Sequence, residues 1–114
     1  QRRYAYDTAG RVVSDEETVF FTVPDPLRRG KTKGASSVRR TEYAYTDAAS
    51  VPDTRFFEDG ELRLMVRHLS ETSYEETVYF EDGFVVQARY EDGIKREESL
   101  YADGELRMRR SFDE

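Results

Sequence analysis

Short runs of alternating apolar and polar residues, separated by turn residues, fill the second half of the chain. Alternation with a period of two residues is typical of strands that pack one face and leave the other in water. No window longer than about ten residues carries a 3.6-residue apolar period, so we expect almost no helix. The pattern predicts six strands, at residues 54–58, 61–69, 74–81, 84–91, 94–102 and 105–112.

One phrase recurs four times between these strands: an aromatic residue, one spacer, then Asp-Gly. Asp-Gly between β-prone runs predicts a two-residue type I′ hairpin loop, because that turn needs positive φ at both central positions. The phrase therefore predicts an all-β fold, an antiparallel meander of consecutive hairpins in a broad sheet that is a single layer or curled. The predicted turn residues are Asp59, Gly60, Asp82, Gly83, Asp92, Gly93, Asp103 and Gly104.

Two-residue loops would also set the strand register. They predict Glu76 opposite Arg89, and Glu98 opposite Arg109. One face would be mostly apolar and buried, with the residues Phe84, Tyr101, Leu106, Tyr79, Val86, Ser99, Met108, Ala88, Tyr90 and Phe112. The other face would be a charge ladder in water, with the residues Gln87, Glu98, Arg109, Glu76, Arg89, Arg96 and Ser111.

The first half begins with a strand, a turn and a second strand, predicted from Tyr4-Ala5-Tyr6-Asp7 and Gly10-Arg11-Val12-Val13. A further strand at 18–23 ends at Pro24. Residues 27–40 carry six cations and no acid, and their Gly and Ser content predicts an exposed loop between strands near 18–23 and 38–46. This basic loop is either a solvated hairpin tip or a contact for an acidic partner or another anionic surface. Its candidate partner-binding residues are Arg28, Arg29, Lys31, Lys33, Arg39 and Arg40.

Composition narrows the class of protein. A length of 114 residues predicts one domain, 1–114, and a net charge of −6 argues against nucleic-acid binding. The chain has no Cys, which excludes disulfides and thiolate chemistry, and no apolar run long enough to span a bilayer. Its apolar area comes largely from 8 Tyr and 7 Phe, which favours a shallow sheet over a thick core.

No residues converge on a catalytic or metal site. His68 is the only histidine, and the neighbouring carboxylates Glu75-Glu76 and Glu97-Glu98 would point to opposite faces of a strand. Three consecutive acids, Asp15-Glu16-Glu17, do not converge as calcium ligands do. We therefore predict a protein that is not an enzyme and that binds no metal and no cofactor.

Two stretches resemble known repeat families. Tyr4-Ala5-Tyr6-Asp7 with Gly10-Arg11 resembles the YD repeat of RHS-type proteins, and Tyr43-Ala44-Tyr45 partly repeats it. Residues 55–112 resemble the MORN-variant repeats of YwqK-like antitoxin-type proteins and of bacterial envelope proteins. The second resemblance implies a repeat sheet with an interaction role and no inherited catalytic residues. We expect a periplasmic or cell-surface localisation rather than a cytoplasmic one.

Two functions fit these observations. The first is a non-enzymatic β-repeat interaction or structural module of a bacterial envelope or secreted protein, which binds a protein partner or associates with itself through a sheet face or edge. The alternative is a small β-barrel that carries an apolar ligand among its Phe and Tyr side chains.

Overall fold

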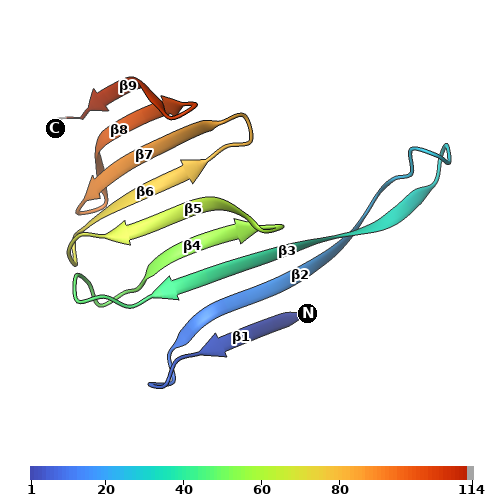
Figure 1. Cartoon of the computed structure of the whole chain (residues 1–114), viewed down its shortest axis with the longest axis horizontal. Helices are drawn as coiled ribbons and strands as arrows, with labels where there is room; N and C mark the ends of the chain where they lie inside the picture. The colour runs from blue at the N-terminus through green and yellow to red at the C-terminus, as the bar shows by residue number, and fades with distance from the viewer. Residues whose placement is uncertain (113–114) are drawn as a thin grey trace.

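The computed structural model describes residues 1–112 and shows one antiparallel sheet whose nine strands follow the sequence order (Figure 1). The predicted all-β meander is confirmed. The described residues contain no helix, and therefore none that could cross a membrane. The strands are β1 (Arg2–Tyr6), β2 (Val12–Pro24), β3 (Thr32–Ala44), β4 (Asp53–Glu58), β5 (Glu61–His68), β6 (Ser73–Tyr79), β7 (Phe84–Glu91), β8 (Ile94–Ala102) and β9 (Glu105–Ser111).

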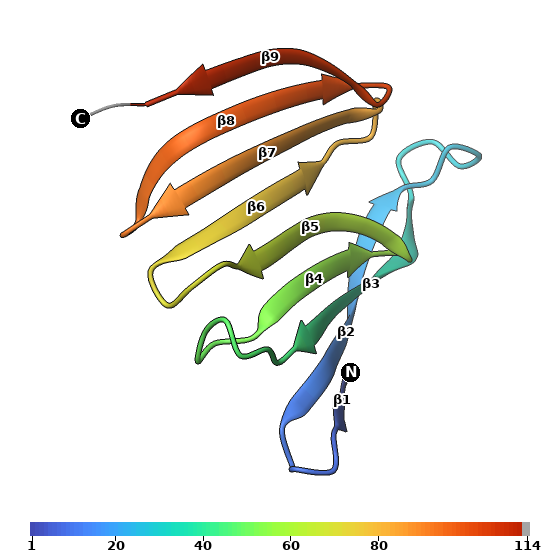
Figure 2. The same cartoon turned by 60° about the vertical axis from the view of Figure 1, so that its left-hand side comes forward.

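The sheet is a single open layer. β1 and β9 lie at opposite edges and do not pair, so the sheet is not closed into a barrel (Figures 1 and 2). The radius of gyration is 18.2 Å, against about 13 Å for a compact domain of roughly this length. Among residues 1–112, only Ala49, Thr77, Ala88 and Ser99 are buried. Of the two predicted forms, a single layer or a curled sheet, the structure takes the open single layer, and the closed barrel is not formed.

Three of the four Asp-Gly turns have the predicted geometry. Asp59 and Gly60 have φ values of 50° and 83°, and the pairs at 92–93 and 103–104 are also positive at both positions. Asp82-Gly83 differs, because only Gly83 has a positive φ, of 79°. There Phe80 N donates to Phe84 O at 2.9 Å and closes a three-residue loop, the form in which a left-handed Gly follows a type I turn.

The predicted pairing is wrong away from the turns. Glu76 lies opposite Ala88 rather than Arg89, and Arg109 lies opposite Ser99 rather than Glu98. The longer loop at Gly83 shifts β6 by one residue against β7. A β-bulge near the other two turns shifts β8 against β7, and β9 against β8. Each one-residue shift exchanges the two faces of a strand.

The three β-bulges occur at the same position relative to the Asp-Gly turns, which the alternation of apolar and polar residues does not reveal. After each type I′ turn, the third residue beyond Gly has no opposite partner, and in all three cases it is an arginine: Arg63, Arg96 and Arg107. Such a residue is the extra one of a β-bulge, which bends the strand and adds twist. The turn at Gly83 has Val86 at this position and no bulge follows it.

The corrected pairing still separates the faces by polarity. Cross-strand partners share a face, and on one face they form an unbroken apolar row from β4 to β9: Phe56, Leu64, Val78, Val86, Leu100 and Met108. We call this side the row face and the opposite side the ladder face. The side chains of β7 point to the faces that the sequence predicted. Those of β6 and of most of β8 point to the opposite faces. The bulges in β8 and β9 each add one such exchange, so Met108 again lies on the apolar side, the row face.

The sequence predicted a buried apolar face, but the row face is not buried, because no second layer covers it. Met108 is 41% exposed and the other five residues of the row are half-buried. Their shielding comes from neighbouring side chains of the same sheet. A single layer therefore leaves a continuous apolar strip within reach of a partner.

The first half of the sheet departs most from the expected elements. β2 and β3 are 13 residues long each and pair from Ser14↔Glu42 to Pro24↔Thr32. Residues 32–40, predicted as part of the basic loop, belong to β3, and the connection between the strands shrinks to residues 25–31. Gly34 and Ser36 are strand residues because Thr22 and Phe20 pair with them, so ladder hydrogen bonding overrides their weak strand propensity.

Candidate interaction surfaces

The outer part of the β2–β3 hairpin projects from the sheet as a two-stranded ribbon (Figure 1). We call residues 19–37 the arm. Its pairing partners on either side stop at its base, since β1 reaches only Glu17 and β4 ends at Glu58, opposite Arg39. Along the arm, Phe20 is 69% exposed and Leu27 at the tip is 91% exposed. A lone two-stranded ribbon is marginally stable in water, so the arm is a surface that a partner would stabilise.

Four of the six predicted partner-binding cations lie on the arm. Arg28 contacts Asp25 at 3.7 Å, and no ion pair within residues 1–112 involves Arg29, Lys31 or Lys33. Asp25 shapes the tip by accepting a hydrogen bond from Leu27 N at 2.9 Å. The predicted exposed connection is thus confirmed, with a shorter loop and a longer ribbon.

The other two cations belong to the sheet. Arg39 lies 3.7 Å from Glu58, and Arg40 lies 3.5 Å from Glu42. The Arg40 guanidinium also stacks over the Phe57 ring, 4.7 Å from its centroid. Arg39 and Arg40 were predicted with the arm cations because they are close in sequence. Strand pairing instead places them beside Glu58 on β4 and Glu42 on β3.

Asp59, in the turn between β4 and β5, fastens the base of the arm. Its carboxylate accepts hydrogen bonds from Val38 N at 2.8 Å and from Ser37 Oγ at 3.2 Å, and its own N donates to Val38 O at 2.8 Å. A turn residue predicted only for its φ thus also sets where the ribbon leaves the sheet.

The row face ends in a cluster of rings beside the apolar row. Tyr74 and Tyr90 stack with centroids 4.9 Å apart, and His68 lies 5.9 Å from Tyr74. Lys95 Nζ lies 5.8 Å from the Tyr90 centroid and 2.7 Å from Glu98. Hydrogen bonds from Lys95 and from Arg110 lower the pKa of Glu98. The tyrosines here pack against one another across strands, as the sequence predicted for most of them.

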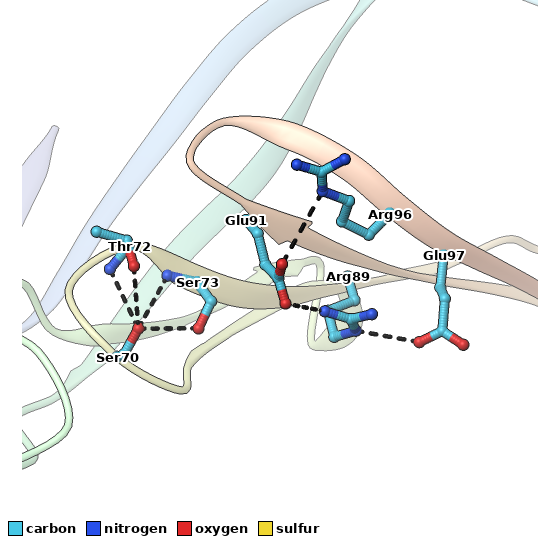
Figure 3. A network of polar contacts seen from close by, with 7 residues as sticks. All are labelled: Ser70, Thr72, Ser73, Arg89, Glu91, Arg96 and Glu97. Atoms are coloured by element: carbon cyan, nitrogen blue, oxygen red, sulfur yellow. Dashed lines mark hydrogen bonds and ion pairs between the residues drawn. The ribbon is translucent and has the colours of Figure 1, made fainter. Parts of the chain in front are cut away.

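The ladder face carries a series of ion pairs between neighbouring strands. Arg67 lies 2.6 Å from Glu75, and Arg89 lies 3.0 Å from Glu97. Figure 3 shows Arg89 between Glu97 and Glu91, with Arg96 also 3.9 Å from Glu91. The Ser70 hydroxyl in the same view accepts from Ser73 N at 3.2 Å and holds the β5–β6 turn. Such exposed pairs contribute about 0–1 kcal/mol each, so the ladder adds more to solubility than to stability.

A groove of about 530 Å³ crosses β2 to β5 on the ladder face. Its floor includes Ser14, Glu42, Arg55 and Met65, which are successive cross-strand partners. Charged side chains, among them Glu42, Arg55 and Arg67, line it together with apolar ones such as Val13, Met65 and Val66.

The structure groups no metal-binding set in the part of the chain that it describes. Residues 1–112 contain no cluster of three or more His, Asp or Glu side chains able to hold a metal. His68 Nδ1 lies 3.2 Å from Asp53 Oδ1, which also accepts from His68 N at 2.7 Å. The adjacent carboxylates separate as predicted, because Glu75 pairs with Arg89 on the ladder face and Glu76 with Ala88 on the row face.

The residues of the YD-like motif build the β1–β2 turn. Asp7 Oδ1 accepts hydrogen bonds from Ala9 N and Arg11 N, both at 2.9 Å, and Asp7 Oδ2 accepts from Arg11 Nε at 2.9 Å. The Arg11 guanidinium lies 4.2 Å from the ring centroid of Tyr45, whose hydroxyl donates to Val12 O at 2.7 Å. The full motif and its partial repeat are thus joined in space.

This turn should respond to acid. The hydrogen bond from Arg11 N, helped by the Arg11 side chain and Ala9 N, lowers the pKa of Asp7. A lowered folded pKa means that the stabilisation is present above the unfolded value of about 3.9 and is lost as pH falls through the folded value. NMR titration should place the Asp7 midpoint below its midpoint in the urea-unfolded chain. Asp7→Asn should remove the loss of amide protection at Arg11 in acid, and equal midpoints would contradict this assignment.

Comparison of the chain with protein-family models, with curated proteins and with solved structures gave no match. The likeness of residues 55–112 to MORN-variant repeats therefore stays a prediction from their sequence.

Proposed function

We propose that this protein is a non-enzymatic interaction or structural module that offers its row face to a protein partner. The apolar row carries the proposal, since six cross-strand partners form a strip over six strands that no second layer covers. Contiguous exposed apolar surface of this kind marks interaction sites in soluble proteins. The repeat resemblance supports a role in a bacterial envelope or secreted protein.

The row is also suited to recognition by its construction. Its residues stand on adjacent strands rather than on loops, so a partner would meet a surface that is already ordered. The ladder face, which carries ion pairs such as Arg67–Glu75 and Arg89–Glu97, keeps the opposite side in water. The open edges of β1 and β9 offer a second mode, the addition of a strand from a partner.

The test compares two neighbours on β7 that face opposite ways. A partner is first identified by cross-linking in envelope extracts and is then purified for binding measurements. Val86→Ser on the row should weaken binding by about tenfold, because truncating a central apolar contact removes about 1.4 kcal/mol. Gln87→Ser on the ladder face is the matched control and should change affinity little.

Equal effects of the two substitutions would contradict binding through the row face. Elemental analysis and native mass spectrometry of the purified chain provide an independent check. We expect neither a stoichiometric metal nor a bound small molecule, and either one would contradict the proposal in favour of an enzyme or a carrier.

A further inference from the structure

The chain presents two uncovered surfaces of similar length, the apolar row and the arm. The row spans six strands, or about 24 Å at about 4.8 Å between neighbours. The arm holds six pairs, from Val19↔Ser37 to Pro24↔Thr32, and is therefore about 20 Å long at about 3.3 Å per residue. An arm laid across the strands would cover nearly the whole row.

The two surfaces also differ in charge. The arm contains four cations and one acid, a net charge of +3. The whole chain has a net charge of −6, so the rest of the chain carries −9. Acids border the apolar row on both sides: Glu76 stands beside Ala88, and Glu105 pairs with Ala102, which itself pairs with Phe84 on the row face. No ion pair within the described residues involves Glu76, whereas Glu105 lies 3.3 Å from Arg107 of its own strand, an exposed pair that an arm cation could replace.

The arm offers apolar as well as basic groups to such a surface. Phe20 and Phe21 form a shallow hollow with Gly34, Ala35 and Ser36 on the paired strand. Lys33 pairs with Val23 at the outer end of the ribbon. Apolar contacts flanked by opposite charges would fix both the position and the direction of the arm on the row.

We propose that a second copy of this chain is the partner, and that each copy lays its arm across the apolar row of the other. This inference rests on the proposed function, because it names the occupant of the row face. A reciprocal exchange is symmetric, as most homodimers are. Each copy then contributes an arm of 19 residues and a row face, which meets the roughly 20–30 residues a side of a standard interface.

Sedimentation velocity of the full chain tests the exchange. We expect a concentration-dependent dimer at about 0.1 M salt that weakens at about 1 M, where the Debye length falls from about 10 Å to about 3 Å. Lys31→Glu with Lys33→Glu on the arm should raise the dimer Kd at least about tenfold. Arg109→Glu, a reversed cation on the ladder face, is the matched control and should leave Kd within about twofold.

Charge exchange between two variants provides the sharpest readout. Glu76→Lys with Glu105→Lys should weaken the dimer as the arm reversal does, while Asp47→Lys in an exposed loop should not. Mixing the arm-reversed and row-reversed chains should restore dimerisation, because both arm–row contacts in the mixed dimer then join opposite charges. Native mass spectrometry identifies the mixed dimer by mass, and circular dichroism confirms that each variant is folded. Lys31→Gln with Lys33→Gln should give an intermediate Kd.

Three results would overturn the inference: a monomer at all concentrations, a dimer indifferent to the arm reversal, or no dimer in the mixture. Co-purification of nucleic acid that is lost on arm reversal would also overturn it, by giving the arm another ligand. If the chain is monomeric while a different protein binds in a Val86-dependent manner, the second copy fails as partner and the proposed function stands.

Discussion

Ala88→Glu should lower the free energy of unfolding by about 2–3 kcal/mol, the largest loss that we expect from a single substitution in the sheet. Ala88 is 5% exposed in the middle of β7, and its cross-strand neighbours are Glu76 and Glu98. A glutamate there would lose hydration and would stand between two carboxylates. Because the sheet has one layer, its neighbours can move aside, which keeps the loss at the lower end for a buried charge. Urea unfolding followed by circular dichroism measures it.

Ala88→Lys is the matched control for charge. It adds a side chain of similar length at the same place, but its cation would lie between two acids instead of adding a third. We expect it to cost at least about 1 kcal/mol less than Ala88→Glu. In the predicted register residue 88 would lie opposite Thr77 and Glu97, with one acidic cross-strand neighbour, whereas the observed pairing gives it two, Glu76 and Glu98. Equal costs for the two variants would contradict the pairing seen here.

Asp59→Ala should destabilise the protein by about 2 kcal/mol and should loosen the arm. The loss combines two exposed hydrogen bonds from the arm base, worth about 0.5 kcal/mol each, with a cost of about 1 kcal/mol for Ala at a φ of 50°. Hydrogen exchange should accelerate at the amides of residues 19–23 and 32–38. Protection in β6 to β9 should change little, since those strands lie beyond β5 from this turn.

Asp92→Ala separates the turn from the arm. Asp92 has nearly the same φ, 52°, in the same type of turn, and within residues 1–112 its side chain makes no hydrogen bond. We expect this variant to show only the backbone cost, about 1 kcal/mol, with unchanged exchange in the arm. Identical exchange in the arm for both variants would show that Asp59 does not hold its base.

The amino-acid sequence predicted only one of the two interaction surfaces. The cluster of cations at residues 28–33 is a local feature, so its exposure followed from the sequence. The apolar row is a property of pairing, and it depends on three arginine bulges and one longer loop. The signal for the bulges is present in the sequence, since Asp-Gly is followed by two residues and then Arg at positions 63, 96 and 107. The fourth Asp-Gly, which lacks this Arg, is also the one whose loop differs.

The amino-acid sequence by itself determined the all-β class, the positions of the turns and the bounds of the C-terminal strands. These depend on local backbone preference and on alternation within a few residues, which neighbouring strands do not alter. Tertiary structure decided which residues share a face, how far the arm extends, and that the sheet stays open. Each of these depends on pairing between distant residues, where one extra residue in a strand reverses its two faces and the balance of ladder hydrogen bonds turns Gly34 and Ser36 from loop into strand.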